Sequence, residues 1–536
     1  MSEITACIIV RDEEDNLPAC LAALSPWVAE VCVVDTGSND RTVEIAEEFG
    51  ARLVHFQWSG DFSAARNACL DMASHDWVLC VNADERLQAS SGPALKRATL
   101  DVDAAAPMAW LVYQDSLLLN GRKKPLLLPR LFRNDRRIRY VRPVHECVME
   151  SLREIGHGAL KPCDVHLEHT GYLPGVASKR GRSRPSQVIL REMVLAYPDD
   201  LFARFNLARS QRDPKARFDA FSAAATLADR VGRQDCAQYP FLSLLYDGWI
   251  GCLIGRGKLT EAMTVAARAA AKLPRAPEIR WRQGDVAARV GDAEAAEPYL
   301  KDCLTPHHAT QVYGSDPQIR GLLPARRLAE AALASDAFDD AIHWANRAAH
   351  FDGSDAEVRC TILRSMIAKG SVGPALRMLT NLLNDAGKHP AVRLLAGELA
   401  WQQGEPDAAV DLWETGAGDC DAGQRCRAHL TIAALVRPDF TSARDLLDAL
   451  VVRDLPTAGI HAVATIVLRE PYEREEAFEP GRLRAVVADI LRDLVNRNAR
   501  AALSAFRAQA EQYTDQIPGV DSLLERSPGR KSGVPR

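Results

Sequence analysis

Acidic and amide side chains follow three short apolar runs near the start of the chain. The residues concerned are Glu13, Asp35, Asn82 and Asp84. If the runs are neighbouring parallel strands, their carboxyl ends lie at one edge of a sheet, which is where ligands of such sheets bind. Carboxylates gathered there can hold a hard divalent cation, which in turn binds phosphate oxygens. The alternative is that Asp35 and Ser38 cap the helix that follows them, but capping explains one such end more readily than three.

These side chains need a framework, and the sequence up to about residue 180 alternates short β-type runs with helical runs. We expect strands at 6–10, 31–34, 52–56 and 77–81, and helices at 13–24, 41–49 and 63–72. Strand runs separated by helical runs favour βαβ units and a parallel sheet with right-handed crossovers. The strand runs are nearly all apolar, which is typical of strands covered by helices on both faces. An arginine-rich stretch at 130–142 is interpreted as mostly sheet edge.

Common nucleotide-binding motifs are absent from this alternating part. A nicotinamide dehydrogenase needs GxGxxG after the first strand, and a P-loop nucleotidase needs GxxxxGK[ST]; neither occurs. The Gly-rich loop that a sugar-nucleotide pyrophosphorylase carries after its first strand is absent as well. By motif, the expected sheet belongs to none of these classes.

Beyond about residue 186 the β signal fades, and an alanine recurs in the same local setting at Ala262, Ala296, Ala341, Ala375, Ala409 and Ala443. The intervals are 34, 45, 34, 34 and 34 residues, and the longer one fits an insertion around 307–314. A 34-residue period is typical of tetratricopeptide-like helical hairpins. Gly284 and Gly397 stand twelve residues before two of these alanines, where two helices must approach closely. The alternative is a generic alanine-rich helical domain without a repeat.

Composition narrows the class of protein. The 536-residue chain has 66 Lys and Arg against 71 Asp and Glu, a formal net charge of −5, so no nucleic-acid partner is expected. No apolar run approaches the roughly 18 residues of a transmembrane segment. Residues 1–14 lack the pattern of a secretory signal. The 13 cysteines are scattered without a CxxC pair, so we expect a reduced, cytoplasmic protein.

Five blocks of the alternating part carry a family resemblance. They read IIVRDEEDNL, VVDTGSNDRTVEIA, DFSAARNACLDMASHDWVLCVNADERL, PRLFRND and VRPVHE. In this order they resemble the family 2 glycosyltransferases of GT-A fold, over residues 4–172. Joined to helical repeats, they resemble the bacterial subgroup that includes peptide S-glycosyltransferases, flagellin-modifying enzymes and envelope-polysaccharide enzymes.

The expected fold is therefore an α/β GT-A domain with a Rossmann-like, mostly parallel sheet, followed by an all-α array of tetratricopeptide-like repeats. We expect the GT-A domain at 1–182, the repeats at 183–455, C-terminal helices at 456–515 and a flexible tail at 516–536.

The resemblance implies a set of donor-binding residues. Asp35 corresponds to the aspartate that contacts the nucleotide base, and Glu13 to the acidic residue that shapes the same pocket. Arg66, in the RN pair of the third helix, corresponds to a nucleotide contact. The family's DxD motif reads Asn82-Ala83-Asp84 here, so its last aspartate, the direct metal ligand, is kept. Asn82 has lost the charge but can still hydrogen-bond a ribose or a metal-bound water.

The resemblance also implies a base and a second metal ligand. Glu146 matches the general base, which takes the proton of an acceptor hydroxyl or thiol as it attacks the anomeric carbon. One base and direct displacement imply inversion at that carbon. His169, in EHTGY, matches an H-x-G-Y element and can ligate a metal together with Asp84. A divalent cofactor, Mn²⁺ or Mg²⁺, would stabilise the leaving nucleoside diphosphate. The alternatives are a surface glutamate at 146 and a packed histidine at 169.

We therefore expect an inverting glycosyltransferase that moves a sugar from a nucleotide-sugar donor, UDP-linked, to a protein or peptide acceptor held by the repeats. One alternative is an envelope or lipopolysaccharide glycosyltransferase. Another is a non-enzymatic repeat scaffold with a degenerate transferase domain, because Asn82 departs from the motif. The repeats could also only pack on the transferase or form a homodimer.

Overall fold

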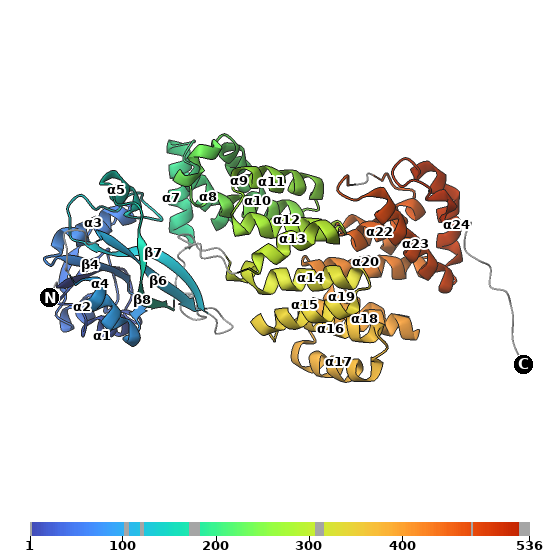
Figure 1. The fold of residues 1–536 in the computed structure, drawn as a ribbon, viewed down its shortest axis with the longest axis horizontal. Helices are drawn as coiled ribbons and strands as arrows, with labels where there is room; N and C mark the ends of the chain where they lie inside the picture. The colour runs from blue at the N-terminus through green and yellow to red at the C-terminus, as the bar shows by residue number, and fades with distance from the viewer. Residues whose placement is uncertain are drawn as a thin grey trace, which may run out of the picture. The chain divides into compact units, whose positions relative to one another are not determined.

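The computed structural model of the chain describes residues 3–100, 107–117, 123–170, 183–305, 316–472 and 475–524 (Figure 1). The chain divides into two compact units, the first formed by residues 1–227 with 308–316 and the second by 228–307 with 317–536. The insertion expected around 307–314 and residues 525–536 of the expected tail lie outside the described residues.

The first unit contains one mixed sheet, whose described strands run in the order β3-β2-β1-β4-β7-β6-β8-β5. Their bounds are β1 Ile4–Val10, β2 Glu30–Asp35, β3 Arg52–His55, β4 Trp77–Asn82, β5 Glu85–Leu87, β6 Ala109–Leu117, β7 Lys123–Arg133 and β8 Lys161–His169. The first four strands in this order are parallel, as the apolar runs predicted. Strand β7 runs antiparallel to β4 and to β6, β8 lies parallel to β6, and β5 runs antiparallel to β8. The interpretation of Arg130 as sheet edge is wrong, because β7 lies between β4 and β6.

Helices cover both faces of this sheet. One apolar core cluster joins the strands to α1 Leu17–Leu24, α2 Thr42–Glu48 and α4 Gly92–Ala98. A second cluster joins the opposite strand faces to α3 Phe62–Met72 and α5 Met149–Glu154. Along β1, Ile4, Ala6, Ile8 and Val10 belong to the first cluster and Cys7 to the second. Because both faces are covered, the parallel strands are apolar throughout.

The first unit continues past the boundary expected at residue 182. Helices α7 Ser183–Ala196 and α8 Leu201–Ser210 contribute to an apolar cluster with Trp58, Phe62 and Val144 of the sheet domain. Helix α9 Pro214–Asp229 follows and reaches the division between the two units.

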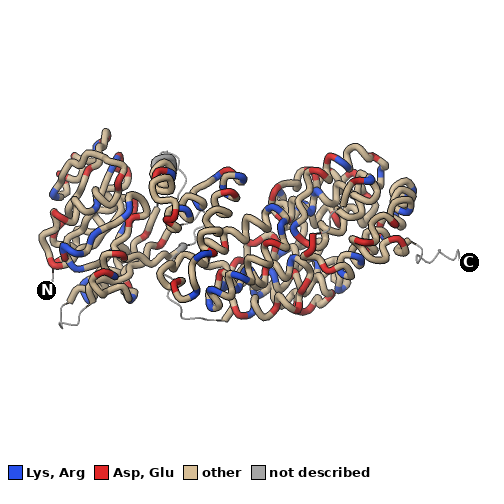
Figure 2. The backbone as a smooth tube through the Cα atoms, turned by 90° about the horizontal axis from the view of Figure 1, so that it is seen from above, with Lys and Arg blue, Asp and Glu red and all other residues tan. Residues whose placement is uncertain are grey.

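The second unit is entirely helical in its described part. Its helices are α10 Leu242–Gly255, α11 Leu259–Lys272, α12 Pro277–Arg289, α13 Ala293–Cys303, α14 Leu322–Ala334, α15 Phe338–Phe351, α16 Ala356–Ala368, α17 Val372–Ala386, α18 Pro390–Gln403, α19 Pro406–Gly416, α20 Asp421–Val436, α21 Phe440–Asp448, α22 Leu455–Leu468, α23 Pro480–Asn496 and α24 Arg500–Gln509. Basic and acidic residues are intermixed along these helices (Figure 2).

The repeat predicted from the alanine spacing is present in these helices. Each of the six recurring alanines is the fourth residue of its helix, in α11, α13, α15, α17, α19 and α21, and each is fully buried. The two glycines lie at close helix contacts, as predicted. A Cβ atom on Gly284 would meet Leu300 at 2.6 Å, and one on Gly397 would meet Trp413 at 2.3 Å. A GT-A-type α/β domain followed by helical repeats, the predicted fold class, is thereby confirmed.

None of the described helices is both long enough and apolar enough to span a membrane.

Candidate functional site

Arg66 lies at the centre of the candidate site. Helix α3 carries this residue into the interior, where it is only 6% exposed. Its Nε donates a hydrogen bond to Oε1 of Glu146 at 2.7 Å, and its Nη2 donates to Oδ1 of Asn82 at 2.8 Å. The guanidinium also lies 5.3 Å from the centre of the Tyr140 ring. Because a buried cation needs such partners, Arg66 ties the end of β4 to the loop that carries Glu146.

Asn82 is held from two sides. Its amide oxygen accepts from Arg66 and, at 3.4 Å, from Arg130, while its Nδ2 donates to Oε1 of Glu85 at 3.1 Å. Glu85 is fully buried, and its carboxylate also accepts from the Asn82 backbone amide at 2.7 Å and from Gln114. An amide at position 82 serves this network because it donates and accepts at once, whereas an aspartate only accepts.

Glu85, Arg130 and Gln114 were not among the predicted site residues. Glu85 directly follows the Asn82-Ala83-Asp84 motif, and Arg130 stands in PRLFRND, so both lay inside blocks that carried the resemblance. Gln114 lies in β6, outside every block, and nothing in the sequence singled it out.

The ion pair with Arg66 determines the pKa of the Glu146 carboxylate. The side chain is 15% exposed, and burial by itself raises the pKa of Glu146. The charge and hydrogen bond of Arg66 outweigh burial, so the pKa of Glu146 lies below its ordinary value. Glu146 is therefore ionised at neutral pH, and its basicity depends on how tightly Arg66 holds it.

Asp84 and His169 form a second pair in the site. Strand β5 pairs with β8 so that Glu85 lies opposite His169, and this register brings Oδ2 of Asp84 to 3.1 Å from Nε2 of His169. The Asp84 backbone carbonyl accepts from the Thr170 amide at 3.1 Å. On the other side of the ring, Nδ1 lies 3.3 Å from Oγ of Ser116. A partner on Nδ1 directs Nε2 towards Asp84.

The chemistry of this pair fits a divalent cation. Carboxylate oxygen and imidazole nitrogen are both ligands of divalent cations, and Oδ2 of Asp84 and Nε2 of His169 lie 3.1 Å apart, at hydrogen-bond distance. In the described part of the chain, no group of three or more His, Cys, Asp and Glu side chains gathers as a metal site. A cation here would thus take its remaining ligands from water and substrate, which is how Mg²⁺ is commonly held beside phosphates.

Asp35 ends β2 and organises the turn that follows. The residue is 3% exposed, and its carboxylate accepts from the amides of Gly37 at 3.2 Å and Ser38 at 3.0 Å. His55 Nδ1 lies 3.2 Å from the same carboxylate. Burial by itself raises the pKa of Asp35. Hydrogen bonds from Ser38 and His55 lower it by more than burial raises it, so the pKa of Asp35 lies below its ordinary value. The capping alternative is wrong for Asp35, because helix α2 begins only at Thr42 and has no side-chain cap, whereas Asp35 holds the turn before it.

Glu13 lies beside Asp35 at the same edge of the sheet. Val10 of β1 pairs with Asp35 in the register, and Glu13 follows β1 directly. The Glu13 amide donates to Oγ1 of Thr42 at 2.7 Å, and its carboxylate accepts from Asn16 at 2.8 Å. The carboxyl ends of β2, β1 and β4 thus present Asp35, Glu13 and Asn82 in succession at one edge of the sheet.

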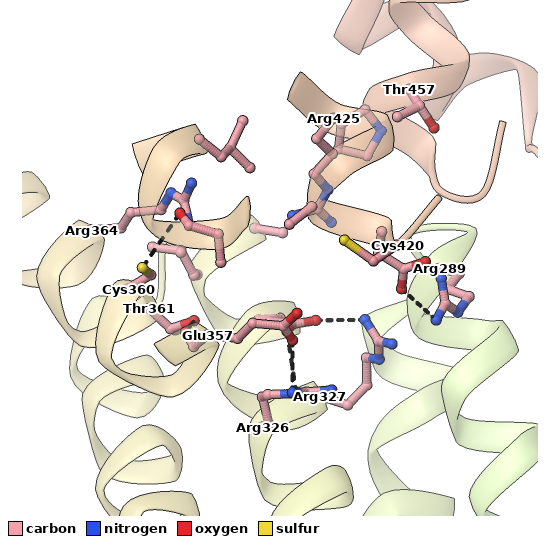
Figure 3. A pocket seen from close by; sticks show the side chains of 18 of the residues that line it. Arg289, Arg326, Arg327, Glu357, Cys360, Thr361, Arg364, Cys420, Arg425 and Thr457 are labelled. Carbon is pink, nitrogen blue, oxygen red and sulfur yellow. Dashed lines mark hydrogen bonds and ion pairs between the residues drawn. The ribbon is translucent and has the colours of Figure 1, made fainter. Parts of the chain in front are cut away.

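A separate cavity lies within the second unit, with a volume of about 600 Å³. Helices α12, α14, α16, α18, α20 and α22 line it. Figure 3 shows arginines from several of these helices reaching into the same space. The arginines of its wall are Arg282, Arg289, Arg326, Arg327, Arg364 and Arg425.

Acidic partners hold these arginines in place. Asp285, which is 1% exposed, lies 2.7 Å from Arg327 and 3.1 Å from Arg289, and Arg289 also reaches Asp421 at 2.7 Å. Arg364 lies 2.9 Å from Glu398. Burial would raise the pKa of Glu398, but Arg364 and His429 lower it to about 2. The cavity wall thus carries fixed donors and acceptors of both charges.

Comparisons with known proteins agree with the first unit's geometry. Residues 5–149 match the family model described as glycosyl transferase family 2. A TPR repeat-containing protein of Synechococcus elongatus is 36% identical over 208 residues, which cover 38% of this chain and 50% of the relative. The SPbeta prophage-derived glycosyltransferase SunS of Bacillus subtilis is 25% identical over 204 residues, covering 37% and 46%.

Among solved structures, S. aureus TarS 1–349 in complex with UDP-GlcNAc is 18% identical, covers 56% of this chain and 91% of that chain, and has a TM-score of 0.29. This likeness is too low to carry an argument. The chain spans about half the length of the curated relatives it matches, 50% of the first and 46% of SunS. The family match over residues 5–149 confirms the resemblance drawn from the five sequence blocks.

Proposed function

We propose that this chain, whose residues 5–149 form a family 2 glycosyltransferase domain, transfers a sugar from a UDP-linked nucleotide-sugar to an acceptor with inversion at the anomeric carbon. The observation that carries the proposal is the buried Arg66, which contacts Glu146 and Asn82 at the carboxyl edge of the sheet. This edge is where open α/β sheets bind their ligands.

The donor's two ends meet different parts of this edge. Asp35 and Glu13, after β2 and β1, are assigned to the nucleotide base and its pocket. Asp84 and His169 would hold Mn²⁺ or Mg²⁺, which neutralises the charge that gathers on the leaving diphosphate. The convergence of these two ligand-type side chains at the end of β4 supports this assignment.

Glu146 is assigned as the general base. A carboxylate that takes the acceptor proton works best when its pKa is near the working pH, yet the ion pair with Arg66 holds the pKa of Glu146 low. Donor phosphate oxygens would compete for the Arg66 guanidinium. Because Arg66 is the main group that lowers this pKa, its movement towards phosphate would raise the basicity of Glu146 as the donor binds.

The acceptor is assigned as a protein or peptide held by the second unit. Helical repeats present an inner surface that suits a polypeptide. The cavity of about 600 Å³, with its fixed arginines and carboxylates, supports this assignment because such a wall can bond both polar groups of a peptide backbone.

Donor binding is tested by thermal unfolding of the full chain with a panel of nucleotide-sugars, with and without Mn²⁺. A donor at 100 times its Kd raises the unfolding free energy by about 2.7 kcal/mol. We expect a UDP-sugar to stabilise the wild type only when Mn²⁺ is present, and we expect this stabilisation to be lost in Asp84→Ala. The control is Asp213→Asn, since Asp213 contacts the Ala216 amide at the start of α9, and it should be stabilised like wild type. If no nucleotide-sugar stabilises the chain, the alternative of a degenerate transferase domain is favoured.

The acceptor is tested by incubating the full chain with labelled donor and bacterial lysate, then treating the products with protease or extracting them with organic solvent. Label that protease releases as glycopeptides supports the protein acceptor. Label that enters only the lipid or polysaccharide fraction would contradict it and favour the envelope alternative.

A further inference from the structure

The loop that carries Glu146 has an unusual backbone. An isolated bridge between Val141 and Cys147 closes it, with hydrogen bonds of 3.2 and 3.4 Å. Within the loop, Arg142 has φ +79° and His145 has φ +54°. Residues other than glycine rarely adopt this left-handed region, and they persist there only when their surroundings impose it. The direction of the Glu146 side chain therefore depends on contacts that hold the loop from outside.

Helix α8 supplies the polar part of these contacts. Asp200 uses its two carboxylate oxygens differently, since Oδ1 accepts from the Ala203 amide at 3.0 Å and so caps the helix. Oδ2 accepts from Nη1 of Arg142 at 2.8 Å. The guanidinium of Arg142 also lies 4.8 Å from the centre of the Phe202 ring. One strained loop residue is thus fixed by the first turn of α8.

The same turn contacts the second strained residue. The His145 ring meets Phe202 edge to face, with centres 6.3 Å apart and planes at 88°. Between the two, the side chain of Val144 is buried in an apolar cluster with Leu190 of α7 and Ala203 of α8. Three successive parts of the loop are therefore held by helices that follow the sheet domain in the chain.

The loop has anchors in the sheet domain too: Arg66 of α3 holds the Glu146 carboxylate itself, and three other contacts hold the beginning of the loop. The Arg142 carbonyl accepts from Oγ of Ser63 at 2.5 Å, and the Pro143 carbonyl accepts from the Phe62 amide at 2.8 Å. Glu150 of α5 also pairs with Arg142, at 2.9 Å. None of these three contacts reaches residues 144–146, the part that bears Glu146.

We propose that Asp200 is a positioning residue for Glu146: with Phe202, it locks the 142–146 loop so that the base points to Arg66 and the reacting centre. Helices α7 and α8 are then part of the catalytic domain, and not only a connection to the repeats. The catalytic consequence rests on the proposed function, whereas the structural lock does not.

The lock is tested first without substrate, by hydrogen exchange of the peptide that spans residues 139–150 in the full chain. Asp200→Asn is the main variant, because asparagine caps a helix about as well as aspartate but loses the charge that holds Arg142. Asp213→Asn is the matched control, since Asp213 accepts from the Ala216 amide at the start of α9. Phe202→Leu removes the ring and leaves the cap untouched.

We expect exchange at residues 141–147 to be at least about fivefold faster in Asp200→Asn and Phe202→Leu, and unchanged in Asp213→Asn, because opening of the bridge is then easier. Unchanged protection in both loop variants would overturn the proposal.

The second readout is the kinetics of sugar transfer. A misplaced base lowers kcat and leaves the KM for donor nearly unchanged. Loss of folded protein lowers the apparent kcat in the same way, so kcat is calculated per folded molecule, with the folded fraction measured in the same sample. We expect kcat to fall at least about tenfold in Asp200→Asn, with donor KM within about twofold of wild type. Faster exchange with normal kcat would overturn the positioning role. If Glu146→Gln has normal turnover, the base assignment fails while the exchange result still decides the lock.

Discussion

Glu146→Gln separates proton transfer from charge pairing in the candidate site. Glutamine keeps the shape of the side chain and an oxygen that can accept from Nε of Arg66, now 2.7 Å from the carboxylate. It removes the negative charge and the ability to take a proton. The substitution therefore acts on the rate through basicity and on stability through the lost partner of a buried cation.

The two effects have different sizes. Loss of a general base slows a reaction about 100- to 10,000-fold, which corresponds to about 2.7–5.4 kcal/mol in the barrier. Breaking a buried ion pair by removing one partner costs about 3–5 kcal/mol of stability. The side chains of Arg66 and Glu146 are 7% and 15% exposed, so solvent screens this pair little. Because the amide oxygen still accepts from Arg66, we expect a stability loss of less than about 3 kcal/mol.

In Glu146→Gln, the affinity for the donor should stay the same or rise while the rate of transfer falls. Arg66 is held less tightly by a neutral amide than by a carboxylate, so the affinity of Glu146→Gln for UDP should equal or exceed that of wild type. Calorimetry with UDP and Mn²⁺ measures this affinity, and a transfer assay at saturating acceptor measures the rate.

Glu30→Gln is the matched control for this experiment. Glu30 forms a part-buried ion pair with Arg52 at 2.5 Å. Glu30 begins β2, so it lies at the amino ends of the parallel strands, whereas the site lies at their carboxyl ends. We expect it to lower stability and to leave the rate unchanged. Turnover of Glu146→Gln within about threefold of wild type would refute the reasoning, because the base would then be another residue.

Three further predictions concern the metal, pH and the repeats. Asp84→Ala and His169→Ala should each abolish the Mn²⁺ dependence of UDP binding in calorimetry; metal-dependent affinity that survives both changes would remove the metal assignment. Since the pKa of Glu146 is lowered in the folded chain, its carboxylate stabilises the fold above the ordinary value of about 4.3, and this contribution is lost as pH falls through the folded value. The difference between wild type and Glu146→Gln in the free energy of unfolding by urea should therefore shrink below about pH 4. A difference that stays constant with pH would contradict the ion pair. Gly397→Ala, whose Cβ would lie 2.3 Å from Trp413, should destabilise the second unit by about 1–3 kcal/mol in thermal unfolding, whereas a gain in stability would argue against close helix packing there.

The parts of the fold that could be predicted are those with a strong local signal. The parallel strands read as continuous apolar runs because both their faces are covered, and the observed bounds of β1 and β4 extend the expected runs by at most two residues. The repeat alanines could be found because each hairpin needs a small residue at the same helix contact. The arginine-rich stretch at 130–142 was interpreted as sheet edge because cations are typical of exposed strands, yet its first four residues belong to β7, inside the sheet.

The sequence predicted single residues of the candidate site, but not the contacts between them. The acidic and amide positions follow strand ends, so their convergence depends only on strand order. The Arg66–Glu146 contact joins residues 80 positions apart, and no spacing in the sequence indicates it. Glu85 was missed because a carboxylate after a metal motif reads as solvated, whereas here it is fully buried beneath Asn82 and Gln114. The contacts of Asp200 were missed because this residue caps α8, a helix that the sequence analysis assigned to the repeats.

Release of UDP from a UDP-sugar, measured with the full chain, Mn²⁺ and lysate as the acceptor source, tests the central claim most directly. The account predicts UDP release and a labelled product of inverted anomeric configuration with wild type and Glu30→Gln, and at least about 100-fold less of both with Glu146→Gln. If folded wild-type chain releases no UDP from any sugar donor, or if the product retains the donor's configuration, the account is contradicted.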